Sequence, residues 1–239
     1  MTASTRRAYH LPMFQLAANS SLSNTAFTLR LIECGVLFFL IPLLLTFYKN
    51  IVPPIPVLIA FTLVMGVWLW LDPTFDRSAV WNTRDFAKHL TAIVSLFLLV
   101  AVVLGAALYL YQPDALFAFP RERPFIWLIV MCFYPLVSVV PQTIIYRAFF
   151  FHRYESLFPS AIAMILFAGV AFGFGHIIFK NWIAITLTLA GGLIFAWRYY
   201  TTRSLLISTI EHAMYGQLIF TLGYGMFLFH GRASVTPGG

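Results

Sequence analysis

The chain has 239 residues, of which 61% are hydrophobic and 10% are charged. A soluble domain has about a quarter charged residues, so the composition excludes an ordinary soluble fold and indicates a lipid bilayer as the surroundings. The net charge of +7 comes from basic residues placed singly between apolar runs. This pattern argues against nucleic acid as a partner and is typical of residues that set membrane orientation.

Apolar runs long enough to cross a bilayer recur along the chain, since a spanning helix needs about 20 such residues. The predicted spans are residues 31–48, 51–71, 90–111, 125–147, 161–179, 182–200 and 204–229. We therefore predict an all-α fold, a polytopic membrane helical bundle with about seven transmembrane helices.

The spans divide the chain into four regions. These are a cytoplasmic or interfacial N-terminal tail (1–30), N-terminal transmembrane helices (31–124), a core bundle with the candidate site (125–230) and a disordered tail (231–239). With the N-terminus inside, ten Lys and Arg residues fall on the inner side and five on the outer side, which favours this orientation. We expect an integral protein of a bacterial inner (plasma) membrane with its N-terminus in the cytoplasm.

The first half offers little chemistry. We interpret Glu33, near the inner end of the first span, as an interfacial acid that snorkels or pairs with an arginine. Cys34 and Cys132 lie in apolar runs without C-x-x-C spacing, so neither a disulfide framework nor a cysteine metal site is expected.

Three polar clusters interrupt three spans of the second half. They are Gln142, Thr143 and Arg147; the stretch FGFGH, which ends at His176; and EHAMYGQ, which contains Glu211 and His212. Ionisable residues at membrane depth usually face a bundle interior or a wet cavity, so we predict one shared cavity. A rise of about 1.5 Å per residue places Gln142 and His176 at one depth. If the helix RAFFFHRYESLF projects beyond the membrane, the cavity opens toward the cytoplasm.

Five glycines accompany these clusters and are expected to allow close helix packing. They are Gly169, Gly173, Gly175, Gly191 and Gly192.

The three clusters resemble the CAAX-protease and bacteriocin-processing (CPBP, or Abi) superfamily of glutamic intramembrane proteases. Its pattern is Glu-Glu-x-x-x-Arg, then Phe-x-x-x-His, then His-x-x-x-Asn. The matching stretches are QTIIYR (142–147), FGFGH (172–176) and HAMYG (212–216), within a resemblance that covers residues 125–222. The paired glutamates are replaced by Gln142 and Thr143, and the asparagine is replaced by Gly216.

The resemblance implies roles for these positions. In the family, the first glutamate, assisted by histidine, activates water, and the last histidine and the asparagine stabilise the oxyanion. Gln142 cannot accept a proton near neutral pH, so it cannot be a general base. Thr143 could be a nucleophile only with a base in hydrogen-bond reach. The family-equivalent positions are Gln142, Thr143, Arg147, His176 and His212.

Glu211 is a possible substitute base, although its place next to His212 turns it toward a neighbouring helix or Arg147. His176 and His212 could also converge on a zinc ion. Because catalytic zinc usually takes three protein ligands and no third ligand is placed, we expect no metal and no other cofactor.

Two functions stay open. The first is a protease homologue that has lost peptidase activity and binds a membrane peptide or partner protein through its cavity. The alternative is an active intramembrane peptidase in which Glu211 or His212 is the base. In either, Arg147 caps the cavity and pairs with Glu211, helix-end carbonyls or a ligand carboxylate, or else it is an anchor that snorkels to headgroups.

Overall fold

The computed structural model describes residues 23–84 and 86–228. Residues 1–22 of the predicted N-terminal tail (1–30) and the predicted C-terminal tail (231–239) lie outside this part of the chain. The first half contains α1 (Asn24–Gly35), η1 (Val36–Leu40), α2 (Ile41–Tyr48), α3 (Pro54–Leu71), η2 (Arg77–Val80), α4 (Phe86–Tyr111), η3 (Pro113–Ala115) and α5 (Ala118–Glu122). The second half contains α6 (Pro124–Tyr134), η4 (Pro135–Val139), α7 (Val140–Thr143), η5 (Ile144–Phe149), α8 (Phe150–Tyr154), η6 (Glu155–Leu157), α9 (Ala161–Gly175), η7 (Ile177–Phe179), α10 (Trp182–Thr202), α11 (Leu205–Leu222) and η8 (Tyr224–Phe227).

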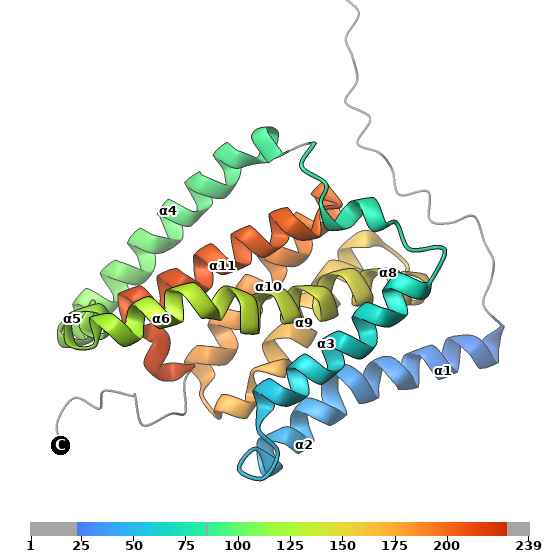
Figure 1. Ribbon diagram of the computed structural model, residues 1–239, viewed down its shortest axis with the longest axis horizontal. Helices are drawn as coiled ribbons and strands as arrows, with labels where there is room; N and C mark the ends of the chain where they lie inside the picture. Colours follow the sequence, from blue (N-terminus) through green and yellow to red (C-terminus); the bar gives the residue numbers. More distant parts are fainter. Residues whose placement is uncertain (1–22, 85, 229–239) are drawn as a thin grey trace, which may run out of the picture.

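The elements form one helical bundle, which confirms the predicted fold class (Figure 1). Six continuous helical stretches are long and apolar enough to cross a membrane: 24–48, 54–71, 86–111, 124–157, 161–179 and 182–202. The seventh predicted span corresponds to α11, which packs along α4 and α10 and is less apolar because it carries Glu211, His212 and Gln217.

Short polar side chains define where several helices begin. Four side chains each accept a hydrogen bond from a backbone N–H in the first turn of the helix that follows, as expected of N-cap residues. They are Ser23, Ser160, Asn181 and Ser204. Because Ser23 caps α1, this helix begins at Asn24, earlier than the predicted start at residue 31.

The fourth spanning stretch, residues 124–157, is interrupted by prolines. Proline has no N–H to donate, so Pro135 coincides with the start of the π-helical turn η4, and Pro141 precedes the π-helical turn η5. The carbonyl of Met131, four residues before Pro135, accepts a hydrogen bond from Gln217 Nε2 at 2.9 Å. The lost helical bond is therefore replaced by one that ties α6 to α11.

The end of this stretch, which includes RAFFFHRYESLF, is packed against other helices of the bundle. Phe150 and Tyr154 have 0% exposure and pack against the Phe38 ring at 5.2 and 5.9 Å. Glu33 accepts hydrogen bonds from Arg153 at 2.8 and 3.0 Å and from the Tyr154 hydroxyl at 2.9 Å. The interpretation of Glu33 as an arginine-paired acid is confirmed, and this pairing draws α8 against α1.

Glycines bring α9 and α10 together as predicted. A Cβ on Gly169 would overlap the Leu193 side chain, and one on Gly173 would lie 3.0 Å from the Leu189 Cα. A Cβ on Gly192 would lie 2.9 Å from the Gly169 carbonyl oxygen. This close approach positions Phe172 and His176 of the α9 end against α10.

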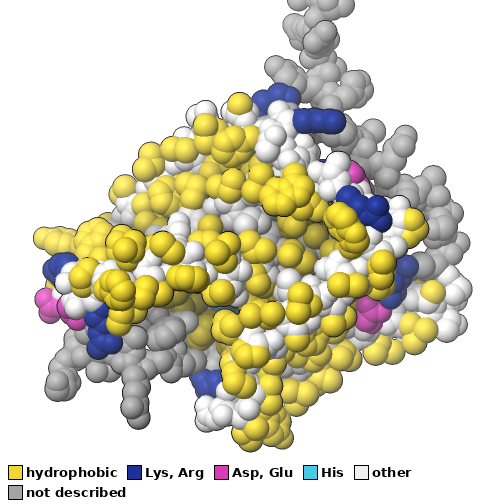
Figure 2. Space-filling model, viewed as in Figure 1, with side chains coloured by type: hydrophobic (Ala, Val, Ile, Leu, Met, Phe, Trp, Pro, Cys, Tyr) yellow, Lys and Arg dark blue, Asp and Glu magenta, His cyan; other side chains and the backbone are white. Residues whose placement is uncertain are grey.

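The surface agrees with a lipid environment. In Figure 2 hydrophobic side chains cover the middle of the visible face, whereas Lys, Arg, Asp and Glu gather toward its ends. Exposed hydrophobic residues such as Val64, Val102, Leu110 and Phe125 are more than two-thirds accessible, which is the pattern of helices that face acyl chains.

Candidate functional site

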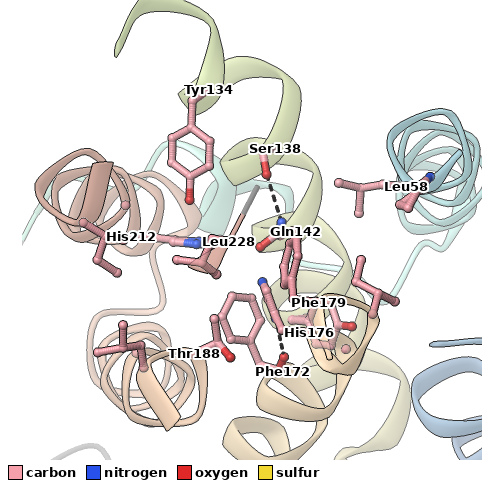
Figure 3. Close-up of a pocket in the computed structure, with 18 of the residues that line it drawn as sticks. Leu58, Tyr134, Ser138, Gln142, Phe172, His176, Phe179, Thr188, His212 and Leu228 are labelled. Carbon is pink, nitrogen blue, oxygen red and sulfur yellow. Dashed lines mark hydrogen bonds between the residues drawn. The ribbon is translucent and has the colours of Figure 1, made fainter. Parts of the chain in front are cut away.

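A cavity of about 1010 Å³ lies between helices of both halves (Figure 3). Most of the wall is apolar. Its polar side chains are Ser138, Gln142, His176, Thr188 and His212, the phenols of Tyr134, Tyr146 and Tyr215, and Lys49 with Asn50 at one end. None of the described residues on the wall is Asp or Glu. Gln142, His176 and His212 thus share one cavity, as predicted.

The cavity does not lie on the predicted side. Its wall reaches Lys49, which follows α2, and Leu228, which follows η8. These positions are at the end of the bundle opposite to Glu155, because each spanning helix crosses once between them. The expectation that the cavity opens on the side of the N-terminus is therefore wrong. Lys49 Nζ donates to the Ile178 carbonyl at 3.1 Å, and burial and the charge of Lys180 lower the Lys49 pKa.

Gln142 lies on α7 with its carboxamide on the cavity wall. Its Nε2 donates to Ser138 Oγ, one turn earlier, at 3.0 Å. Its Oε1 is buried and has no hydrogen-bond partner within the described ranges. The carboxamide oxygen is therefore held toward the cavity by the bond that its own nitrogen makes.

His176 follows the last residue of α9. Its Nδ1 lies 2.7 Å from the Phe172 carbonyl oxygen, and because a carbonyl can only accept, Nδ1 is the donor. A neutral His176 then presents Nε2 as an acceptor, and Figure 3 shows this ring edge turned toward the cavity beside Gln142. The contact fixes both the tautomer and the direction of the imidazole.

Thr143 and His212 meet behind the cavity wall. Thr143 is 2% exposed and does not line the cavity. Its hydroxyl donates to the Val139 carbonyl at 2.8 Å and lies 3.4 Å from His212 Nδ1. A base is thus within reach of Thr143, but the single hydroxyl proton is engaged and a ligand in the cavity does not meet this oxygen. The arrangement is that of a support for His212, whose ring stacks on Phe195 with centroids 4.4 Å apart.

Arg147 is buried and lies beneath the cavity floor. Its side chain is 1% exposed and donates to the carbonyls of Tyr146 at 3.0 Å and Gly192 at 3.1 Å. The guanidinium carbon lies 5.3 Å from the centroid of the Phe172 ring, a cation–π geometry. Neither a pairing with Glu211 nor a headgroup anchor fits this placement, so both of these predictions are wrong. The bonds to carbonyls remain, and they tie η5 to α10.

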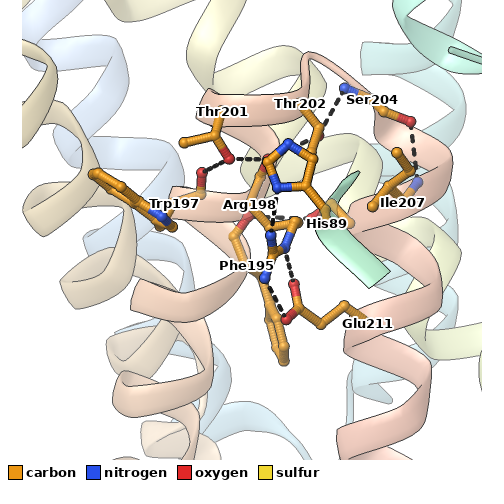
Figure 4. A network of polar contacts seen from close by, with 10 residues as sticks. His89, Phe195, Trp197, Arg198, Thr201, Thr202, Ser204, Ile207 and Glu211 are labelled. Carbon is orange, nitrogen blue, oxygen red and sulfur yellow. Dashed lines mark hydrogen bonds and ion pairs between the residues drawn. The ribbon is translucent and has the colours of Figure 1, made fainter. Parts of the chain in front are cut away.

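Glu211 faces α10, away from the cavity (Figure 4). It is 0% exposed, and Arg198 donates to both of its oxygens, from Nε at 2.7 Å and from Nη2 at 3.1 Å. Arg198 Nη1 lies 3.0 Å from His89 Nδ1; because arginine can only donate, this histidine nitrogen is the acceptor. Glu211 does not line the cavity, which removes the structural basis for its role as a substitute base.

Tyr134 is a site residue that sequence reasoning missed. A Cβ on Gly216 would overlap the Tyr134 ring and hydroxyl, so the phenol fills the space that a larger side chain at 216 would need. Gly216 lies one turn after His212 and on the same helix face. Figure 3 shows the phenol end directed toward the space between His212 and Gln142. The glycine was visible in the sequence, but nothing indicated which side chain would occupy the space beside it.

Metal ligands do not gather in the part of the chain that the structure describes. It contains no group of three or more His, Cys, Asp or Glu side chains that could hold an ion. His176 and His212 would supply two nitrogen ligands, fewer than the three that catalytic zinc usually takes.

These features define a polytopic membrane protein with a polar site inside an apolar bundle. Residues 123–217 match the family model "Type II CAAX prenyl endopeptidase Rce1-like". The match covers the segment from α6 to α11, with every family-equivalent position, and confirms the predicted resemblance to the CPBP superfamily. This segment is therefore similar to the CAAX-type intramembrane proteases, and the similarity is limited to these residues. No curated protein and no solved structure matched the chain.

Proposed function

We propose that this intramembrane-protease homologue binds a membrane-embedded peptide segment in its cavity without hydrolysing it. The observation that supports the proposal most is the chemistry of the wall, where Gln142 stands at the first glutamate position and none of the described lining residues carries a carboxylate. The loss of a general base alone lowers a rate by about 10² to 10⁴. The nearest acid in sequence to the histidines, Glu211, is held on both oxygens by Arg198.

A second candidate is an active peptidase in which an imidazole is the base. It is favoured by His176 Nε2, which faces the cavity as an acceptor, and by His212 on the opposite wall. A histidine alone could activate water. This candidate needs no role for Thr143 or Glu211.

Peptide binding is tested by photo-crosslinking from two matched positions on α6. Phe133 lines the cavity, whereas Phe125, also exposed and on the same helix, does not. A benzoylphenylalanine is placed at either position, and the purified protein is incubated with a library of hydrophobic peptides in nanodiscs. The proposal predicts intact peptides crosslinked through position 133 and few through 125. Equal yields, or no peptide at either position, would contradict it.

We propose in addition that the end of α1 at Asn24 faces the cytoplasm of a bacterial cell, so that Lys49 and the cavity end face the opposite side. The charge count along the loops supports this orientation. In a variant with Cys34 and Cys132 replaced by alanine, an impermeant maleimide added to cells should label Asn50→Cys and leave Ser156→Cys unlabelled. The reverse pattern would invert the topology.

A further inference from the structure

Two buried polar atoms are left without a partner, and both belong to residues of the cavity wall. Among the described side chains, Gln142 Oε1 and the Tyr215 hydroxyl are buried and make no hydrogen bond. Tyr215 is only 6% exposed, and both residues line the cavity. Buried polar groups in proteins are nearly always paired, because an unpaired one loses its hydration without compensation. Of the two, the Gln142 carboxamide lies at the polar part of the cavity wall, and an unpaired acceptor there indicates a ligand with a matching donor.

Tyr134 supplies a donor on the same helical stretch as the Gln142 acceptor. Its hydroxyl makes no hydrogen bond with the described part of the chain, and its ring is fixed by an edge-to-face contact with Phe220 at 5.0 Å. Gly216 leaves the space that the phenol occupies. Tyr134 and Gln142 lie on one continuous helical stretch, 124–157, and Figure 3 shows the Tyr134 hydroxyl and the Gln142 carboxamide oxygen directed toward the same part of the cavity.

The Tyr134 donor and the Gln142 acceptor, with the His176 Nε2 acceptor beside them, select among ligand groups. An ester or a ketone has no hydrogen for Gln142 Oε1. A carboxylate would bring its negative charge against that carbonyl oxygen, and an ammonium group would approach the buried cation of Arg147. A secondary amide offers an N–H and a C=O on opposite sides of one planar unit, which matches both wall groups.

We propose that the polar wall recognises a secondary amide, the backbone unit of an extended peptide. Its carbonyl accepts a hydrogen bond from the Tyr134 hydroxyl, and its N–H donates to Gln142 Oε1. The flanking apolar groups of the peptide lie against the rest of the cavity. This inference rests on the proposed peptide binding and names the group that is recognised and the two residues that recognise it.

The recognised group is tested with three alkyl probes that differ at one position. They are N-hexadecylacetamide, its N-methyl derivative and hexadecyl acetate. Binding to the full chain in dodecyl maltoside micelles is measured from the shift of the thermal unfolding midpoint with probe mole fraction. The native protein should bind the secondary amide about fivefold to tenfold more tightly than either of the other probes, the effect of one neutral hydrogen bond.

Two variants assign the two bonds separately. Gln142→Leu should weaken the secondary amide alone and abolish the preference over the ester. Tyr134→Phe should weaken the amide and the ester by the same factor, about fivefold, because both probes carry the carbonyl. Tyr224→Phe and Gln217→Leu are matched controls, since both side chains make hydrogen bonds elsewhere in the bundle and do not line the cavity; they should bind all three probes like the native chain.

The outcomes separate this inference from the proposed function. Equal binding of amide, N-methyl amide and ester by the native protein would overturn amide recognition, and this comparison needs no variant to fold. Peptide crosslinks through position 133 together with that result would leave peptide binding standing. Conversely, if the native protein prefers the amide probe but no peptide is crosslinked, amide recognition stands and peptide binding is refuted.

Discussion

Removing one partner of the buried ion pair between Arg198 and Glu211 should strongly destabilise the bundle. Both residues are almost fully buried, with exposures of 6% and 0%, and Arg198 binds both carboxylate oxygens at 2.7 and 3.1 Å. Glu211→Leu leaves the guanidinium without a counterion and Arg198→Met leaves the carboxylate without one. Breaking such a pair on one side costs about 3 to 5 kcal/mol, whereas replacing both partners by apolar residues is often neutral.

The free energy of unfolding is measured by titrating SDS into dodecyl maltoside micelles and following helicity by circular dichroism. Each single variant should lose about 3 kcal/mol or more, and the double variant Arg198→Met with Glu211→Leu should lie within about 1 kcal/mol of the native protein. A double variant as unstable as the sum of the two single variants would refute the ion-pair reasoning. So would a Glu211→Leu variant that keeps native stability, since that is the behaviour of a carboxylate kept for chemistry.

Three further predictions concern stability in the same assay. Gly173→Ala should lower the free energy of unfolding by about 1 to 3 kcal/mol because its Cβ would meet the backbone of α10. The control Gly66→Ala has no atom within 4 Å of its Cβ and should raise the free energy of unfolding by up to about 1 kcal/mol. Equal effects of the two substitutions would contradict close packing of α9 and α10. Tyr215→Phe should leave the free energy of unfolding unchanged or raise it by about 1 kcal/mol because it removes an unpaired hydroxyl. Tyr224→Phe should lower it by about 1 kcal/mol because it removes a hydrogen bond to a backbone carbonyl of α4. A larger loss for Tyr215→Phe than for Tyr224→Phe would show that the Tyr215 hydroxyl is paired. Arg147→Lys keeps the positive charge but not the planar guanidinium that reaches two carbonyls. This variant should lower the free energy of unfolding by about 2 kcal/mol. Native stability in Arg147→Lys would show that only the charge of Arg147 matters.

The spans were predictable because lipid imposes a length and an apolar composition on each of them. Every predicted span corresponds to a helix or a continuous helical stretch. The boundaries differ most at the start of α1, which Ser23 caps, and at the end of residues 124–157, where the predicted span ends at residue 147. The shared cavity of Gln142, His176 and His212 was also predictable, because polar residues on neighbouring membrane helices avoid lipid together.

The partners of the charged residues were not predictable from sequence. Sequence spacing places Glu211 beside His212, but its carboxylate pairs with Arg198 on α10, a choice that depends on how the two helices are rotated. Arg147 likewise donates to the Gly192 carbonyl on α10, and sequence spacing does not show which helix η5 packs against. The packing at the end of residues 124–157 was not predictable because Phe150 and Tyr154 find their aromatic partner far away in sequence, at Phe38.

Non-hydrolytic binding is tested most directly by comparing the native chain with Gln142→Glu, each alone and with His176→Ala. The purified proteins are incubated with a library of membrane peptides, and cleavage products are counted by mass spectrometry. Binding without hydrolysis predicts no products from the native chain, and cleavage by Gln142→Glu that is lost again when His176 is replaced. Products from the native chain that disappear in its His176→Ala or His212→Ala variant would contradict the proposal and establish an imidazole as the base.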